Sequence, residues 1–348
     1  MEIFMANILK IVFVIIGGFI GAGFASGQEI YLFFFSYGFL GIPSLIFASF
    51  LFELVLFKAL EIIQENDINT YTEFLEKIFK PKSKNKYLNI NYIINIIINI
   101  FMTISFFIMI AGFGAYFYQE FGINKLIGSS ILAILCFFVF LSNVKGLLKV
   151  SQVIVPLLII FIFTLGIINI GDIDITNNIN FINKENIIGC FISGILYISY
   201  NLILLIPMLI TIRKYIKDNK SIIAISTICG GIIFILSVLV YFLLLKINID
   251  MLKIEMPVIY AVSKYYNNFK NIYGFVILGA IFTTAISEGM SFLQNISKNK
   301  KSYTQFAIIL CITSVIISNF GFSSLVKLLY PIFGVLGLVE VVCIIKNK

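Results

Sequence analysis

The chain has 348 residues, of which 60% are hydrophobic and only 12% are charged, whereas a soluble domain carries about 25% charged residues. A soluble protein so poor in charge could not cover its surface with polar groups, so the composition predicts an integral membrane protein. The absence of histidine excludes His-ligated metal sites and Ser–His–Asp hydrolases, and the five cysteines, which lie in apolar runs without CxxC spacing, are predicted to be buried and unpaired.

Ten apolar runs are long enough to cross a bilayer, which takes about 20 residues in a helix. The expected fold is therefore all-α and polytopic, with about ten transmembrane helices. Their approximate ranges are 8–36, 39–63, 88–118, 126–143, 147–169, 186–211, 221–246, 270–296, 303–319 and 322–345.

Basic residues give the orientation. Most of the 25 lysine and arginine residues fall in cytoplasmic segments when the N-terminus is placed inside, so both termini are predicted to be cytoplasmic. The same clustering accounts for the net charge of +8 without a nucleic-acid partner. Isoleucine is by far the most frequent residue and Arg213 is the only arginine. On this composition we expect a bacterial cell membrane as the location.

The polar segment 171–185 divides the chain into two halves, 1–170 and 186–348, with five predicted helices each. Because five is odd, the second half enters the membrane from the opposite face, which is the condition for an inverted repeat. An extracytoplasmic linker is the role expected of 171–185. Any ten-helix protein can be divided five and five, so the count leaves open a fold without a repeat.

The first run is interrupted by five glycines within the eleven residues from Gly17 to Gly27, and each costs up to ~1 kcal/mol of helix propensity relative to alanine. The pairs Gly17/Gly21 and Gly23/Gly27 leave open the alternative that the glycines only permit close helix packing. Glu29 follows at membrane depth, where a carboxylate is costly and typically functional. We therefore expect the helix to unwind between Gly21 and Gly27, with free N–H groups for an anion and free carbonyls for a cation.

A zwitterion such as an amino acid suits a site of this kind. The sixth run, 186–211, is expected to supply a matching break near Gly194 or around the polar residues at 197–201, although ordinary interhelical contacts are the alternative. The residues predicted to bind the solute are Gly21, Ala22, Gly23, Phe24, Ala25, Ser26, Gly27, Tyr197, Tyr200 and Asn201.

The eighth run carries Ala280, Thr283, Thr284 and Ser287 at i, i+3, i+4 and i+7, so these residues share one helical face. One carbonyl and two hydroxyls form an oxygen set suited to sodium, and back-bonding of the threonines to their own helix is the alternative.

Four carboxylates lie at membrane depth. Of these, Glu29 and Glu288 are predicted to couple ions or protons. Glu53 is interpreted as a partner of Lys58 or an interfacial residue, and Glu340 as a residue close to the cytoplasmic end.

The segment from Gly17 to Glu29 resembles the first helix of the YkvI-type bacterial membrane proteins, which belong to the amino acid–polyamine–organocation transporter superfamily. The resemblance implies a five-plus-five inverted repeat (the LeuT-like fold) with helices one and six broken around the substrate. It also implies a sodium site at Ala280, Thr283 and Thr284, with carbonyl partners near Gly18 and Gly21. Glu29 departs from the superfamily pattern, because an acid there repels a substrate carboxylate unless it is protonated or paired.

The function expected is ion-coupled secondary transport of a small polar or zwitterionic solute, with sodium or protons as the only cofactor. The sequence contains no GxxxxGK[ST] motif, so an ATP-driven pump is not expected. It also lacks the paired intramembrane aspartates that would indicate an intramembrane enzyme. A receptor that binds without transporting is the alternative from another class, and a channel or intramembrane enzyme is a third.

Overall fold

The computed structural model describes residues 2–79, 90–170, 186–216, 218–245, 256–320 and 322–347, and its regular secondary structure in these residues is entirely helical. The proposed linker 171–185 lies outside the described residues. The helices are α1 (Glu2–Phe19), α2 (Ala22–Ser26), α3 (Gln28–Phe33), η1 (Phe35–Leu40), α4 (Gly41–Glu65), α5 (Tyr71–Phe79), α6 (Ile90–Phe121), α7 (Lys125–Leu141), α8 (Asn143–Ile170), α9 (Ile187–Ile212), η3 (Arg213–Tyr215), α10 (Asn219–Leu245), α11 (Pro257–Tyr265), η5 (Asn267–Phe269), α12 (Lys270–Ile296), α13 (Lys300–Ile317), η6 (Ser318–Phe320) and α14 (Phe322–Lys346).

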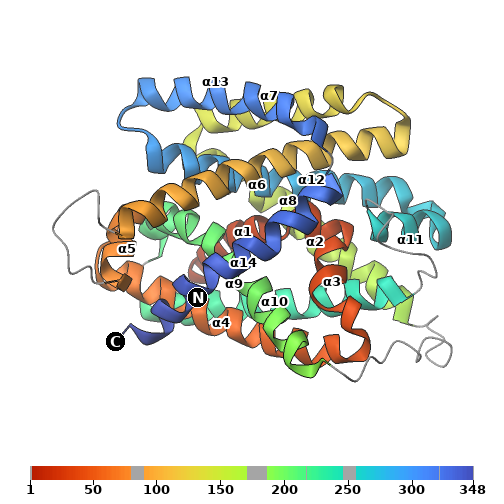
Figure 1. The fold of residues 1–348 in the computed structure, drawn as a ribbon, viewed down its shortest axis with the longest axis horizontal. Coiled ribbons are helices and arrows are strands. Elements are labelled where there is room, and N and C mark those ends of the chain that lie inside the picture. Colours follow the sequence, from red (N-terminus) through yellow and green to blue (C-terminus); the bar gives the residue numbers. More distant parts are fainter. Residues whose placement is uncertain are drawn as a thin grey trace.

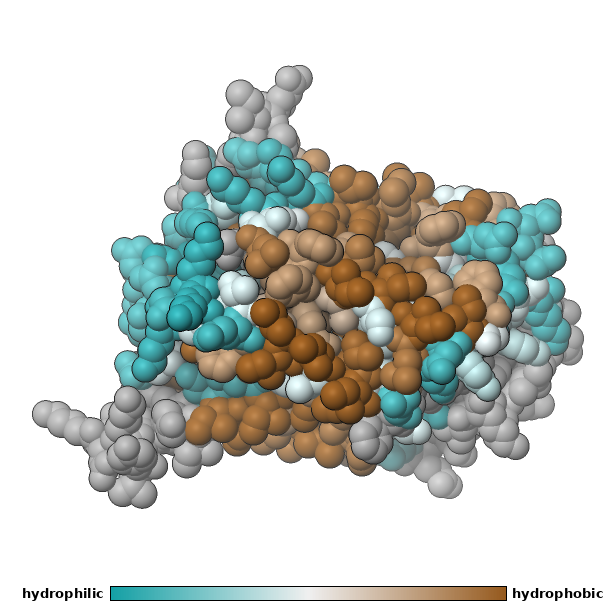
Figure 2. All heavy atoms as spheres, turned by 90° about the horizontal axis from the view of Figure 1, so that it is seen from above, coloured by the Kyte–Doolittle hydropathy of each residue, from teal (hydrophilic) through white to brown (hydrophobic). Residues whose placement is uncertain are grey.

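Eight of these helical segments are long and apolar enough to cross a membrane, and two shorter apolar helices, Asn7–Phe19 and Lys125–Leu141, accompany them. Nine of the ten predicted runs each overlap one of these segments over most of their length, whereas the first run, 8–36, continues past Phe19 into α2 and α3. On the face drawn in Figure 2, a broad hydrophobic band lies between two hydrophilic ends. The chain is a multi-pass membrane protein.

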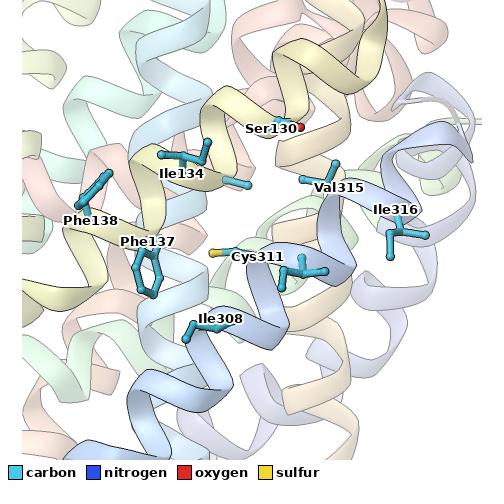
Figure 3. Close-up of a pocket in the computed structure, with 10 residues that line it drawn as sticks. Ser130, Ile134, Phe137, Phe138, Ile308, Cys311, Val315 and Ile316 are labelled. Atoms are coloured by element: carbon cyan, nitrogen blue, oxygen red, sulfur yellow. The ribbon is translucent and has the colours of Figure 1, made fainter.

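The helix α1 lies at the centre of the bundle, where it packs against α8, α9, α10 and α12. The helices α7 and α13 run side by side as an outer layer, and α6 packs beneath them against α12 (Figure 1). Between α7 and α13 is an apolar groove of about 490 Å³, lined by residues such as Phe138 and Ile316 that are exposed at the lipid-facing surface (Figure 3).

The two ends of the molecule carry different short helices. In Figure 1, α5 lies at one end of the long axis and α11 at the other, and the beginning of α1 and the end of α14 lie toward the α5 end. The short helix α5 is amphipathic and buries Tyr71, Phe74, Leu75 and Ile78 along one side.

The break expected in the sixth run is absent from the structure, in which α9 continues from Ile187 to Ile212 with Pro207 inside it. Here the polar side chains bond back to their own helix: Ser199 Oγ donates to Ile195 O at 2.7 Å, and Asn201 Nδ2 donates to Tyr197 O at 3.0 Å. A single glycine at 194 costs only about 1 kcal/mol. The apolar 26-residue helix therefore stays intact.

Two further predictions concern charges and thiols. The four cysteines at 136, 190, 229 and 311 are buried as predicted, Cys343 is only half-buried, and all five are free. The predicted pairing of Glu53 with Lys58 is wrong: Lys58 pairs with Glu61 at 2.7 Å, and Glu53 accepts a hydrogen bond from Thr227 Oγ1 at 2.8 Å.

Candidate functional site

The first transmembrane segment is broken at two points. The helix α1 ends at Phe19, and Gly21 has an extended backbone with φ −93° and ψ −165°. Gly27 then adopts the left-handed conformation with φ 83° before α3 begins. Between the two breaks, Ala22–Ser26 forms one helical turn of its own. The expectation that Gly21–Gly27 is unwound throughout is therefore wrong, because glycine frees the backbone only where it stands.

The break at Gly21 releases two carbonyl groups from the helical pattern. The Gly21 N–H donates to Phe19 O at 3.1 Å and the Ala22 N–H approaches Met109 Sδ at 3.5 Å, so neither reaches the carbonyl four residues earlier. Those carbonyls belong to Gly17 and Gly18. Thr284 Oγ1 donates to Gly17 O at 2.8 Å, which ties α12 directly to the end of α1.

The same glycines permit close helix packing. A Cβ on Gly17 would lie 2.8 Å from Val155, one on Gly18 would lie 3.0 Å from the Ser287 hydroxyl, and one on Gly21 would lie 3.2 Å from Thr284. Small residues at helix contacts allow backbones to approach. The glycines therefore serve both roles that the sequence left open, close packing and a break in the helix. The oxygen-rich face of α12 can reach the α1 backbone only where α1 lacks side chains.

The predicted face of α12 is brought together as a buried set. Ala280, Thr283, Thr284 and Ser287 are all buried, and the last three face Gly17, Gly21 and Gly18 respectively. Thr283 Oγ1 donates to Ala280 O at 3.0 Å, which is the back-bonding alternative. Carbonyl and hydroxyl oxygens from two helices therefore converge here, in a set that suits a hard cation.

Glu29 and Glu288 are both buried, with only 2% and 4% of their surfaces exposed. Glu29 folds back over α2, where its carboxylate lies against Gly23. Glu288 accepts a hydrogen bond from Ser105 Oγ of α6 at 2.7 Å. In each carboxylate the Oε2 atom has no hydrogen-bond partner, and neither residue forms an ion pair with a described lysine or arginine. A buried polar atom without a partner indicates a place for a proton, a water molecule or a ligand.

Aromatic rings surround Glu29. The Tyr200 ring stacks on Tyr330 of α14 with centroids 4.6 Å apart and on Phe33 at 5.6 Å, and Tyr197 packs edge-on against Phe34 at 5.0 Å. The Tyr200 hydroxyl faces the Glu29 carboxylate without completing a hydrogen bond of standard geometry, and the Tyr197 hydroxyl also lacks a partner. Both predicted tyrosines thus lie beside the break, and the hydroxyl of each has no hydrogen-bond partner of standard geometry.

Other predicted residues have local roles. Asn201 is buried, and its amide bonds back to Tyr197 O within α9, which is neither the expected break nor the interhelical contact given as the alternative. Ser26 Oγ donates to Gly23 O at 3.2 Å inside the short turn. Ala22, Phe24 and Ala25 are fully buried and pack the turn into the bundle.

Three residues that the sequence analysis missed complete the site. Ser105 holds Glu288, Tyr330 stacks on Tyr200, and Tyr273 donates its hydroxyl to Ala25 O at the end of α2. A lone serine in an apolar run is a signal for Ser105. The two tyrosines carry no such signal, because buried aromatic residues are common in any bundle.

The chain matches no protein-family model. It is similar to a Bacillus subtilis protein named uncharacterized membrane protein YkvI, with 26% identity over 355 aligned residues that cover 97% of the chain and 95% of that protein. It is also similar to uncharacterized protein YyaD of the same bacterium, with 27% identity over 348 residues that cover 97% of the chain and 96% of YyaD. The chain is therefore a multi-pass membrane protein homologous over nearly its whole length to YkvI and YyaD.

Proposed function

We propose that the protein is a secondary active transporter that carries a small polar or zwitterionic solute by alternating access, coupled to sodium or protons. The observation that carries the proposal is the pair of buried carboxylates, Glu29 and Glu288, each with an unpartnered oxygen beside a twice-broken helix. Burying such groups without a partner costs several kcal/mol, and in a membrane they typically mark ion or solute pathways.

The proposed architecture is a ten-span membrane domain of the LeuT-like type, in which 1–170 and 186–348 are inverted repeats and both termini are cytoplasmic. The positions of α5 and α11 support it: each follows the second helix of its half, and they lie at opposite ends of the molecule (Figure 1). Membership of the amino acid–polyamine–organocation superfamily belongs to the same proposal. The continuous α9 limits the internal symmetry, because only the first half presents a broken helix.

The site divides between two binding roles in this proposal. Glu29 and the aromatic rings of Tyr197 and Tyr200 face the solute, and an ammonium group suits both the carboxylate and the rings. The carbonyls of Gly17 and Gly18 with the Ala280, Thr284 and Ser287 oxygens offer the cation site. Because the Glu29 carboxylate already lies against Gly23 of α2, a solute carboxylate needs another partner or a displaced Glu29.

Uptake by purified protein in proteoliposomes tests the proposal. A thermal-shift screen against amino acids and related solutes, with and without sodium, first identifies a ligand that stabilises the protein by mass action. We then expect the labelled ligand to accumulate above its equilibrium level when an inward sodium or proton gradient is imposed. Binding without accumulation under either gradient would favour the alternative function, a receptor with a transporter fold.

Thr284 provides a test of the sodium site. Thr284→Ala removes the hydroxyl that bonds Gly17 O. We expect the sodium concentration that half-saturates uptake to rise about tenfold, since a hydrogen bond to a charged or coordinated group contributes about 1.5–3 kcal/mol. The matched control is Thr284→Ser, which keeps the hydroxyl. Unchanged sodium activation in a correctly inserted Thr284→Ala variant would remove this assignment.

Orientation is tested with reporter fusions at residues 84 and 178, both of which lie outside the described residues. We expect a reporter at 84 to be cytoplasmic, because Lys82, Lys84 and Lys86 favour the inside, and a reporter at 178 to be extracytoplasmic. Alkaline phosphatase and fluorescent-protein fusions at the two positions give opposite readouts. The same side for both would contradict the three crossings predicted between residues 84 and 178.

A further inference from the structure

A second polar region lies away from the broken helix, at the end of the molecule that carries α5. A cavity of about 100 Å³ opens there between the start of α5, the last turns of α9 and the last turns of α12. It has room for about three water molecules at ~30 Å³ each. Its lining includes Thr70, Tyr71, Thr211, Ser291, Gln294 and Asn295.

The inner wall of this cavity reaches the candidate site. Ser291 is buried and donates its hydroxyl to Ser287 O at 2.7 Å. It lies three residues after Glu288, which is about 4.5 Å along the helix axis. The residues Thr284, Glu288, Ser291 and Asn295 follow one another at intervals of four, three and four along α12, and Ser287 lies beside Glu288, so they form one polar face.

Uncharged side chains hold the walls of the cavity in place. Asn295 Nδ2 donates to Asn95 Oδ1 at 2.8 Å and to Asn99 Oδ1 at 2.9 Å, and Asn95 Nδ2 donates to Thr72 Oγ1 of α5 at 2.7 Å. Thr211 Oγ1 donates to Gln294 Oε1 at 3.0 Å and so joins α9 to α12. Amides and hydroxyls can bind water or a polar solute without trapping it as a fixed charge would.

Tyr71 stands between the cavity and the last transmembrane helix. Its ring is buried and lines the cavity, and its hydroxyl donates to Glu340 Oε1 of α14 at 2.9 Å. Glu340 is buried too, and its Oε2 has no hydrogen-bond partner. The neighbouring ion pair of Arg213 and Asp67, at 3.0 Å, contributes less to the position of α5 than the Tyr71–Glu340 hydrogen bond does. Asp67 is 95% exposed, and exposed ion pairs contribute little.

We propose that this cavity is the mouth of a polar pathway from the α5 end of the molecule to Glu288, and that the Tyr71–Glu340 hydrogen bond is the latch that keeps it closed. The pathway rests on the transporter function proposed above. Opening requires α5 to move away from α14, which breaks this bond, whereas the amides at 95, 99 and 295 can remain joined to one another. Glu340, which the sequence analysis set aside, thereby gains a role as the partner that positions Tyr71.

The test measures access of water to Ser291 in the full-length protein in proteoliposomes. Ser291→Cys is placed in a Cys343→Ala background, since the other native cysteines are buried, and is labelled with methanethiosulfonate ethylammonium. We expect slow labelling in this parent and about fivefold faster labelling after Tyr71→Phe, the factor expected for loss of one hydrogen bond. Glu340→Leu removes the same bond from the other side and is expected to give a similar increase.

Tyr241→Phe is the matched control, because Tyr241 is also buried and donates its hydroxyl to Gly38 O at 2.6 Å near the opposite end. Equal rates for Tyr71→Phe and Tyr241→Phe, or no labelling of position 291 in any variant, would overturn the latch. If Tyr71→Phe does not fold, Glu340→Leu carries the test alone. Labelling needs no transported solute, so the two proposals can fail separately. Accelerated labelling without any uptake would reject the transporter and retain the latch. Uptake without accelerated labelling would reject the latch and retain the transporter.

Discussion

Glu29→Gln is expected to abolish uptake driven by a pH gradient, with a fall of at least about 100-fold in the initial rate. Glu29 is the carboxylate nearest the break, it is 2% exposed, and one of its oxygens has no partner. A carboxyl group can take up and release a proton within a transport cycle, and an amide of the same shape cannot. The measurement is solute uptake into proteoliposomes at a fixed membrane potential with an inward proton gradient.

Two variants separate this role of Glu29 from a general effect of removing a carboxylate. Glu53→Gln changes an acid of α4 that contacts Thr227 and lies outside the site, so uptake should stay near the parent rate. Glu29→Asp keeps an ionisable group and should retain part of the proton response. A normal pH profile in Glu29→Gln would mean that the proton, if one is carried, binds elsewhere, and Glu288 would be the next candidate.

Gly27→Ala is expected to destabilise the protein by about 2–5 kcal/mol and to eliminate uptake. Two costs combine at this position. The left-handed backbone, with φ 83°, costs a residue with a Cβ ~1–2 kcal/mol. The Cβ would also lie 2.6 Å from Val258 of α11, and overpacking of this kind costs about 1–3 kcal/mol. Thermal unfolding in detergent followed by uptake in proteoliposomes measures both effects.

Gly122→Ala supplies the matched control for Gly27→Ala. Gly122 has φ 67°, yet nothing lies within 4 Å of the position that a Cβ would take. It should therefore show the backbone cost without the collision. Gly231, which lies in the interior of α10 with open space around it, should tolerate alanine or gain stability, because alanine has the higher helix propensity. Similar losses in Gly27→Ala and Gly122→Ala would show that the contact with α11 is unimportant.

The sequence predicted the helices well and the arrangement around the site only in part. Apolar runs flanked by polar residues mark membrane helices strongly, because lipid requires both continuous hydrophobicity and internal backbone hydrogen bonds. Five glycines in eleven residues were enough to place a break in the first helix. The face at Ala280, Thr283, Thr284 and Ser287 followed from helical periodicity alone, and its burial against α1 agrees with that pattern.

Contacts between distant segments were beyond the reach of these patterns. Whether Asn201 reaches across to another helix or bonds to Tyr197 O depends on its rotamer and neighbours, which periodicity does not specify. The return of Glu29 onto Gly23 depends on the left-handed turn at Gly27, and no local propensity encodes that direction. Ser105 and Tyr71 are paired with Glu288 and Glu340, which lie 183 and 269 residues away in the chain.

The outer layer formed by α7 and α13 has a consequence for the surrounding lipid. With 17 and 18 residues, the two helices are about 25 and 27 Å long, while the hydrocarbon core of a bilayer is about 30 Å thick. Both short helices lie on the same side of the molecule, whereas α6 beneath them has 32 residues. We therefore expect the bilayer next to α7 and α13 to thin locally, which would concentrate hydrophobic mismatch on this side and favour lipids with shorter acyl chains there.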